Sequence, residues 1–356
     1  MGVIATIKDI ARLTGVSVAT VSNVLNGKAG AASSAKAQEI FEAAHRLRYQ
    51  PNALAKNLKL RRSHTIGIIT EDLTVFNTPE IVDGIESYCE EQGYEIVLAN
   101  MRLFKRYNNN LADTPEHAVL FDKTLRNLLA KQVEGFVYIG YHHRAVSYEP
   151  PRDDIPFVYA YCTPSSHRYT SVVFDDEGAG FAVGNTLLEY GHRKIGVICG
   201  PLTSLNAQAR LRGYQRALYE AGILYNAGWT TFGDWGRESG YTCARQLLEQ
   251  GVTAIFAFND MMASGVYSYC IEHNLAVGRD VSLFGYDNIS VAEAFSPPIS
   301  SVESPLSEMG RRSAAMVLEQ IRAAQRPEPQ QVVLPCKLHL RPSVARIAPS
   351  RSSLGC

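Results

Sequence analysis

The sequence lacks any apolar run that could cross a bilayer, for which about 18 consecutive apolar residues are needed. Residues 1–30 also lack the short apolar core of a signal peptide. We therefore predict a cytoplasmic, nucleoid-associated chain with no membrane partner. The same absence argues against a secreted solute-binding protein.

Paired cysteines are also missing. The seven cysteines are odd in number and none has CxxC spacing. Several fall inside apolar segments, where a thiol acts as a small hydrophobic group. The seven are Cys89, Cys162, Cys199, Cys243, Cys270, Cys336 and Cys356. This usage indicates a reducing compartment and no disulfide framework.

Common enzyme motifs are absent as well. The sequence has no GxSxG elbow, no Walker loop and no HExxH zinc motif. The glycine-rich stretch 178–184 has GxGxxxG spacing instead of GxGxxG, and the acidic residues before it would repel a pyrophosphate. His142 and His143 have no Cys or carboxylate at metal-ligand spacing. We predict no catalysis, no cofactor and no bound metal.

The net charge of the whole chain is zero, but the charge is unevenly distributed. Residues 1–62 hold ten Lys and Arg against three Asp and Glu, a net charge of +7, so the remaining residues carry −7. A basic end on a neutral-to-acidic body predicts a head that binds a polyanion.

The first 26 residues have the pattern of two short helices joined by a tight turn. Thr6 is placed to cap the first helix, with Asp9 as the acidic half of a capping box. Gly15 can adopt the positive φ that ends this helix, and Ser17 is placed to cap the second. Such a pair can be an ordinary bundle corner, or it can insert its second helix into the DNA major groove.

Two later segments favour the DNA-binding interpretation. Residues 34–48 have the apolar spacing of a third helix, which gives a small three-helix core. Pro51 and Asn52 then precede a short basic segment that predicts a helix over residues 53–58. A helix this short needs a partner or a ligand to persist.

Three motifs in this region resemble the headpiece and hinge of the LacI/GalR family of bacterial transcription regulators. They are TIKDIARLTGVS, TVSNVLNG and YQPNALAKNLK, and they follow one another in the family's order and spacing. The resemblance implies a headpiece over residues 1–48 and a hinge helix with linker over 49–64. It also implies a core over 65–346 that binds an effector and dimerises, and we predict a disordered tail over 347–356.

Residues 65–346 alternate short apolar strand patterns with helical ones, which predicts an α/β fold with doubly wound parallel sheets. Their length exceeds one ordinary domain and indicates two lobes. Turn-forming residues place lobe 1 at 65–162 and 291–322, and lobe 2 at 163–290 and 323–346. In the family, this core is similar to a periplasmic sugar-binding protein with its ligand between the lobes.

The resemblance also identifies candidate DNA-binding residues. Val18 and Ala19 occupy the positions that usually discriminate operators, and they can contact a thymine methyl but cannot donate to guanine. Family members often have Arg or His where Asn23 stands, and its amide suits adenine. Leu58 aligns with the hinge leucine that wedges into the minor groove. The full set is Thr6, Ser17, Val18, Ala19, Thr20, Ser22, Asn23, Asn26, Asn52, Ala53, Lys56, Leu58 and Lys59.

Candidate effector-binding residues follow the predicted strands, where open α/β sheets bind ligands. They are Phe76, Asn77, Asp176, Arg210, Trp235, Asn259 and Asp287. The family resemblance implies the effector contacts of Arg210, Trp235, Asn259 and Asp287, whereas Phe76 serves only if its loop shifts by one residue. Carboxylates, amides, a guanidinium and one indole face form a set typical of sugar sites. An Asp or Asn in such a position can also be only a helix cap. Where family members commonly have two aromatic residues after the first strand, this chain has EDLTVFNTPEI, with Asn77 in the aligned position.

The sequence therefore predicts a ligand-responsive repressor that binds a pseudo-palindromic operator in double-stranded DNA as a homodimer. A sugar or glycoside is the leading effector class, and a nucleoside or nucleobase is the second. The alternative function is a sugar-binding protein, or a sugar- or nucleotide-acting enzyme, that has a similar fold and no role at DNA.

Overall fold

The computed structural model describes residues 5–49, 62–107 and 114–347. The chain divides into two compact units, residues 1–63 and residues 64–356.

The first unit is a three-helix domain made of α1 (Ile7–Thr14), α2 (Val18–Leu25) and α3 (Ser34–Arg46). Its centre is formed by Ile10, Val21 and Ile40, which are fully buried. The predicted caps are confirmed. The backbone N–H and the hydroxyl of Thr6 both donate to the Asp9 carboxylate, at 2.9 and 2.7 Å. Ser17 Oγ accepts the backbone N–H of Thr20 at 3.0 Å.

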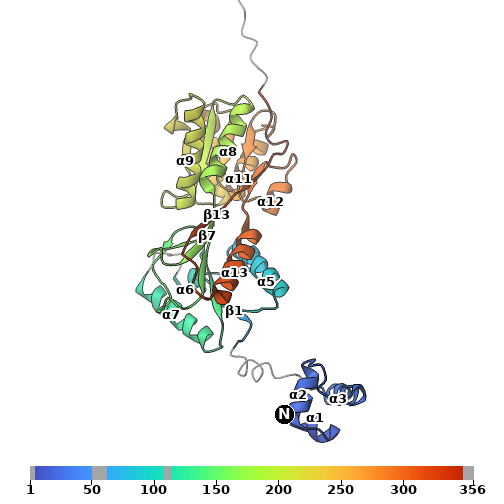
Figure 1. Cartoon of the computed structure of the whole chain (residues 1–356). Helices are drawn as coiled ribbons and strands as arrows, with labels where there is room; N and C mark the ends of the chain where they lie inside the picture. The colour runs from blue at the N-terminus through green and yellow to red at the C-terminus, as the bar shows by residue number, and fades with distance from the viewer. Residues whose placement is uncertain (1–4, 50–61, 108–113, 348–356) are drawn as a thin grey trace, which may run out of the picture. The chain divides into compact units, whose positions relative to one another are not determined.

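The first lobe of the second unit has a parallel six-stranded sheet in the order β13-β7-β5-β3-β1-β2. The strands are β1 (Thr65–Thr70), β2 (Glu95–Asn100), β3 (Gly135–Ile139), β5 (Phe157–Ala160), β7 (Thr170–Phe174) and β13 (Gln331–Leu334). Helices α5 (Thr78–Glu91) and α13 (Leu306–Arg322) cover one face, and α6 (Leu103–Tyr107) and α7 (Pro115–Leu129) cover the other (Figure 1).

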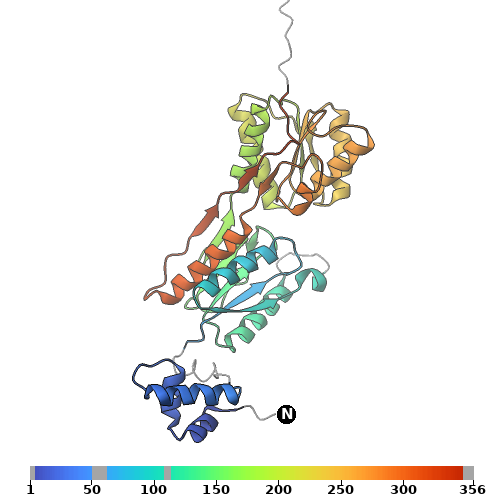
Figure 2. The ribbon, with the colours of Figure 1, turned by 90° about the vertical axis from the view of Figure 1, so that its right-hand side faces the viewer.

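The second lobe has a parallel four-stranded sheet in the order β11-β10-β8-β9. These strands are β8 (Ile195–Cys199), β9 (Thr230–Phe232), β10 (Ala254–Ala257) and β11 (Ser282–Phe284). Helices α8 (Asp176–Glu189) and α9 (Leu205–Glu220) pack together, as do α10 (Arg237–Glu249) and α11 (Asp260–Glu272) (Figure 2). The predicted α/β class with parallel sheets is confirmed.

Short elements complete the second unit. Helix α12 (Ser290–Glu293) packs on α11. Strand β12 (Ser301–Glu303) pairs in antiparallel fashion with β14 (Lys337–His339), next to the segments that connect the lobes. A further two-stranded pair joins β4 (Ala145–Val146) and β6 (Thr163–Pro164).

The predicted lobe boundaries need correction. The turn-rich segment 162–170 joins β5 to β7 within one sheet, because Tyr159 pairs with Ser171. The chain therefore leaves lobe 1 after Phe174 and not after residue 162. Strand β13 also belongs to lobe 1, whereas the predicted boundary placed residues 323–346 in lobe 2. Conversely, Ser300 bridges to Phe284 of lobe 2, although residues 291–322 were predicted in lobe 1.

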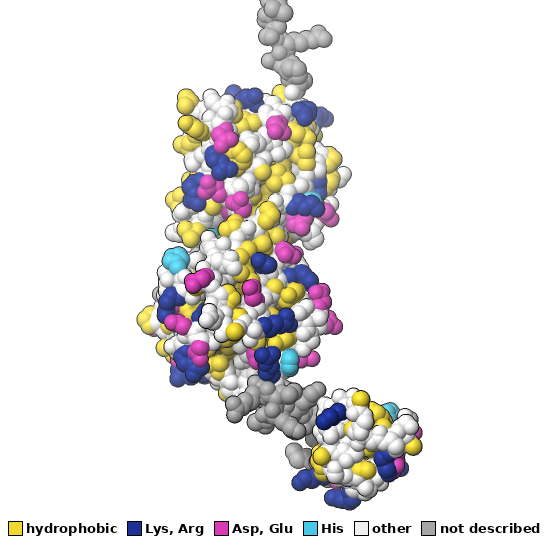
Figure 3. Space-filling model, viewed as in Figure 1, with side chains coloured by type: hydrophobic (Ala, Val, Ile, Leu, Met, Phe, Trp, Pro, Cys, Tyr) yellow, Lys and Arg dark blue, Asp and Glu magenta, His cyan; other side chains and the backbone are white. Residues whose placement is uncertain are grey.

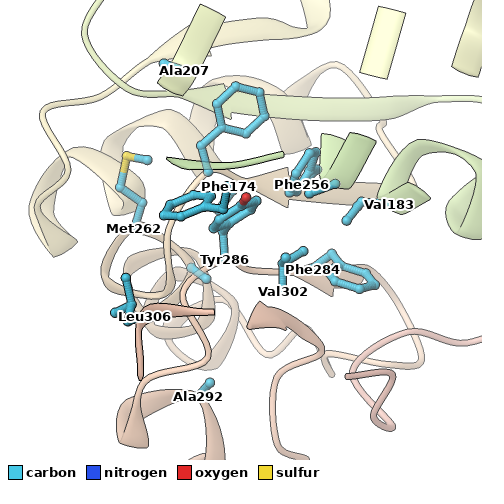
Figure 4. Packing of buried hydrophobic residues seen from close by; sticks show 14 of the residues in the cluster. Phe174, Val183, Ala207, Phe256, Met262, Phe284, Tyr286, Ala292, Val302 and Leu306 are labelled. Atoms are coloured by element: carbon cyan, nitrogen blue, oxygen red, sulfur yellow. The ribbon is translucent and has the colours of Figure 1, made fainter. Parts of the chain in front are cut away.

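One buried hydrophobic cluster runs through both lobes. It includes Phe174 at the end of β7, Tyr286 after β11 and Val302 of β12, which Figure 4 shows in close view. The two lobes are therefore held by packed side chains as well as by the connecting segments. On the face of the core that Figure 3 shows, acidic and basic side chains are interspersed.

Candidate ligand site and nucleic-acid surface

A buried ion pair lies at the centre of the polar cluster where the lobes meet. Arg210 of α9 donates from Nε to Asp176 Oδ1 at 2.7 Å, and both side chains are about 3–4% exposed. Asn206 donates to the other carboxylate oxygen at 2.6 Å, and the Tyr286 hydroxyl donates to Oδ1 at 3.0 Å. A buried carboxylate needs such donors, because it has given up its hydration.

Arg210 retains binding capacity despite this pairing. Its Nη1 donates to the Phe258 carbonyl, and its guanidinium carbon lies 3.4 Å from the ring centroid of Tyr286. Nη2 makes no hydrogen bond among the described residues. Burial opposes the charge, but Asp176 and the other neighbours raise the pKa of Arg210, so the guanidinium stays protonated. The arrangement leaves one charged donor for a ligand.

Asp287 supplies a carboxylate beside this donor. Its φ is +96° and that of Asn288 is +52°, so two consecutive residues other than glycine adopt left-handed backbone. Asp287 is half-buried as a residue, and its carboxylate makes no hydrogen bond or ion pair among the described residues. Burial raises the pKa of Asp287 well above its ordinary value, and the nearby Arg210 opposes this shift. Backbone strain around an unpartnered carboxylate is typical of a binding position.

Trp235 is positioned by a glycine that the sequence reasoning missed. A Cβ added to Gly200, the residue after β8, would lie 2.1 Å from Cζ2 of the indole, so the ring packs directly on the Gly200 backbone. The Trp235 carbonyl accepts Asn259 Nδ2 at 3.0 Å, and Asn259 Oδ1 accepts Met262 N at 2.8 Å. Asn259 is therefore a helix cap, as the alternative reading allowed, and it also fixes the tryptophan loop.

Lobe 1 contributes Asn77 and Tyr161 to the cluster. Asn77 is 3% exposed, donates from Nδ2 to the Tyr141 carbonyl at 3.2 Å, and leaves Oδ1 without a partner among the described residues. Tyr161 lies beside Asn77, within electrostatic range of Arg210 and Asp287. Phe76 is 54% exposed, and no described contact brings it to this cluster.

The cluster is closed in this structure. Asn77, Asp176, Arg210 and Asn259 are all buried. In the described part of the chain, no group of three or more His, Cys, Asp or Glu side chains is arranged to hold a metal ion. Within that part, too, no helix has the length and hydropathy of a transmembrane segment.

Helix α2 presents small and amide side chains to solvent. Val18 is 41% exposed and Ala19 is exposed. The half-buried Asn23 side chain makes no hydrogen bond among residues 5–49, so its donor and acceptor are both available. Asn26 instead donates to the Ser22 carbonyl at 2.7 Å, which caps its own helix.

Five of the predicted DNA contacts belong to the segment that follows the three-helix domain. Asn52, Ala53, Lys56, Leu58 and Lys59 lie outside the described residues, and so does the predicted hinge helix. Thr20 and Ser22 are half-buried on α2, and the Thr20 hydroxyl lies 2.9 Å from the Ser17 hydroxyl.

A helix-turn-helix domain joined to a two-lobed α/β core with a polar cluster between its lobes defines a DNA-binding regulator that responds to a ligand. Two family models match the chain. Residues 6–52 match bacterial regulatory proteins of the lacI family, and residues 185–344 match a periplasmic binding protein-like domain. The chain belongs to the LacI/GalR family of bacterial transcriptional regulators.

Individual relatives agree with this assignment. The HTH-type transcriptional repressor PurR of Vibrio parahaemolyticus is 32% identical over 323 residues, which cover 89% of this chain and 92% of that protein. The lac repressor dimer bound to operator and the anti-inducer ONPF is 26% identical, with TM-score 0.75 and coverage of 96% of this chain and 99% of that one. A CelR–cellobiose complex is 29% identical, with TM-score 0.63 and coverage of 95% and 99%. The chain is thus a ligand-responsive, DNA-binding transcriptional repressor.

Proposed function

We propose that the effector of this repressor is a neutral sugar or glycoside that binds between the lobes. The observation that carries this proposal is the free carboxylate of Asp287 beside the free Nη2 of Arg210. One acceptor and one charged donor suit vicinal hydroxyl groups, and the indole of Trp235 suits the apolar face of a pyranose. The predicted effector contacts Asp176 and Asn259 then act mainly by holding Arg210 and Trp235.

The charge of the cluster supports a neutral ligand. Asp176 already neutralises the single positive charge of Arg210, so the cluster offers no unpaired cation to a phosphate-bearing ligand. A sugar also agrees with the cellobiose complex formed by one structural relative. A nucleobase is neutral too and is therefore the competitor to exclude by experiment.

The geometry also supports a route from ligand to DNA. Asp176 comes two residues after β7, where the chain first leaves lobe 1. The backbone N–H of Asp287 donates to Val302 in the returning segment at 2.8 Å. The backbone N–H of Asp175 donates at 2.9 Å to Leu334, the last residue of β13, from which the third connection starts. Ligand contacts at these residues therefore act on the three connections that set the angle between the lobes.

We propose that two chains pair through their cores and place their headpieces on the half-sites of a pseudo-palindrome, at the bacterial chromosome in the cytoplasm. Val18, Ala19 and Asn23 read A·T pairs, while Thr20 and Ser22 contact phosphates. Leu58 wedges into the minor groove when the paired hinges fold. The lobe angle set by the ligand favours or disfavours that pairing.

A thermal-shift screen of the full-length protein with monosaccharides, glycosides, nucleobases and nucleosides tests the effector class. We expect a sugar or glycoside to raise the melting temperature through preferential binding to the folded state. Asp287→Asn should abolish that shift without unfolding the protein, since asparagine tolerates the positive φ. Asp154→Asn, which alters a 66%-exposed carboxylate, is the matched control. Stabilisation by nucleobases alone would reject the sugar assignment.

A further inference from the structure

Two aromatic side chains that the effector set does not include stand together at the edge of lobe 1. Phe104 belongs to α6, which follows β2, and Tyr141 follows β3. Their ring centroids are 4.4 Å apart with an interplanar angle of 82°, an edge-to-face pair, and both side chains are half-buried. The carboxyl ends of β1, β2 and β3 thus bring an aromatic pair to the ligand-binding edge of the sheet.

A single buried residue fixes both members of this pair. The Glu71 carbonyl accepts the backbone N–H of Leu103 at 2.9 Å, which anchors the start of α6. The Glu71 carboxylate is fully buried. It accepts hydrogen bonds from the backbone N–H of Tyr141 at 2.7 Å and from the hydroxyl of Tyr138 at 2.5 Å. Arg144 pairs with the same carboxylate at 2.7 Å. Groups held in this way lose little freedom when a ligand binds them.

Asn77 connects the aromatic pair to the central cluster. Its amide donates to the Tyr141 carbonyl, and its Oδ1 is buried without a partner among the described residues. A buried acceptor in this condition is stabilised when a ligand supplies a donor. Tyr161 is buried next to Asn77 and lies within electrostatic range of Arg210. Asn77 therefore lies between the aromatic pair and the cluster around Arg210.

We propose that Phe104 and Tyr141 form an outer subsite, which binds the second ring of a glycoside whose first ring lies at Arg210 and Asp287. This inference rests on the proposed sugar effector and extends it. Lobe 2 already supplies a donor, an acceptor and an aromatic face, which suffice for one ring. The additional aromatic pair suits the apolar face of a second sugar or an aryl aglycone, and Asn77 Oδ1 accepts a hydroxyl of the ligand.

Calorimetric titration of the full-length protein with paired methyl and phenyl β-glycosides of glucose and galactose tests the subsite. For the sugar that binds, we expect the phenyl glycoside to bind about tenfold more tightly than the methyl glycoside, as aromatic contacts of this kind allow. Phe104→Ala should reduce this ratio to near one and leave the methyl glycoside affinity unchanged. Phe104→Leu keeps most of the apolar volume and guards against a folding defect. Tyr219→Ala, on an 83%-exposed aromatic residue of α9, is the matched control.

The outcomes separate the two proposals. The subsite proposal is overturned if the unmodified protein binds phenyl and methyl glycosides with equal affinity, or if both affinities fall equally in the two Phe104 variants. Neither result contradicts the proposal of a sugar effector. Absence of binding by every glycoside, with nucleobases binding instead, overturns both. The subsite is supported if the ratio of phenyl to methyl glycoside affinity falls in the Phe104 variants and stays unchanged in Tyr219→Ala.

Discussion

Gly200→Ala tests whether the tryptophan beside the cluster is held where a ligand needs it. The added Cβ would lie 2.1 Å from Trp235 Cζ2 and 2.2 Å from Cη2. Carbon atoms settle about 3.5–4.0 Å apart, so the indole must move by about 1.5 Å. The Trp235 backbone resists this shift, because its carbonyl is bound by Asn259. Overpacking of this kind costs about 1–3 kcal/mol of folding stability. Displacement of the indole removes its contact with the ligand, which is worth about 0.5–1.5 kcal/mol, so we expect the effector affinity to fall roughly 2- to 13-fold.

The assay is calorimetric titration of the effector, together with operator binding measured without effector. Gly228→Ala is the control, because a Cβ there meets its nearest atom at 3.1 Å, on the flexible Asn226 side chain. If Gly200 acts only by seating the indole, Gly200→Ala combined with Trp235→Ala should cost no more than Trp235→Ala alone. Additive losses, or an equal loss of operator binding, would refute this reasoning.

Three further predictions follow from other parts of the molecule. Asn23→Ala should weaken binding to a selected operator by about 1–3 kcal/mol and leave random-duplex binding unchanged, as measured by fluorescence anisotropy. Ser17→Ala removes the cap on α2 and should destabilise the headpiece by about 1 kcal/mol in thermal melts, while the core transition stays in place. Burial raises the pKa of Asp260 to about 7 from an ordinary 3.8, so the folded state favours the protonated carboxyl. The stability that this preference contributes is fully present below about pH 4 and is lost as the pH rises through 7. Chemical denaturation at pH 5 and pH 8 should show a smaller pH dependence in Asp260→Asn, and an unchanged dependence would contradict the assignment.

Local features of the fold could be predicted from the sequence because they depend on neighbours in the chain. The Ser17 cap and the positive φ of Gly15 follow from residue types at fixed spacing, and both are present in the structure. The short apolar runs at residues 65–70 and 135–139 form strands β1 and β3. Periodicity does not reveal helix α11, because buried residues occur all around it and its apolar positions show no one-sided pattern.

The lobe boundaries and part of the polar cluster could not be predicted from the sequence, because they depend on contacts between residues far apart in the chain. No local signal distinguishes a turn within one sheet from a crossing between lobes, so the segment 162–170 was misassigned. The role of Gly200 exists only because Trp235, 35 positions further along the chain, folds back on it. Tyr286 resembles an ordinary core residue until Arg210 is seen 3.4 Å from its ring centroid.

The central claim is that a ligand between the lobes decides whether the headpiece holds DNA. Its most direct test is the affinity of the full-length protein for a duplex selected from a random pool, measured by anisotropy at fixed salt with and without the sugar found in the thermal screen. We predict a pseudo-palindromic site, a change of at least about tenfold in its affinity when the sugar is added, and loss of this change alone in Asp287→Asn. A protein that selects no site, or whose affinity the sugar leaves unchanged, would contradict the claim.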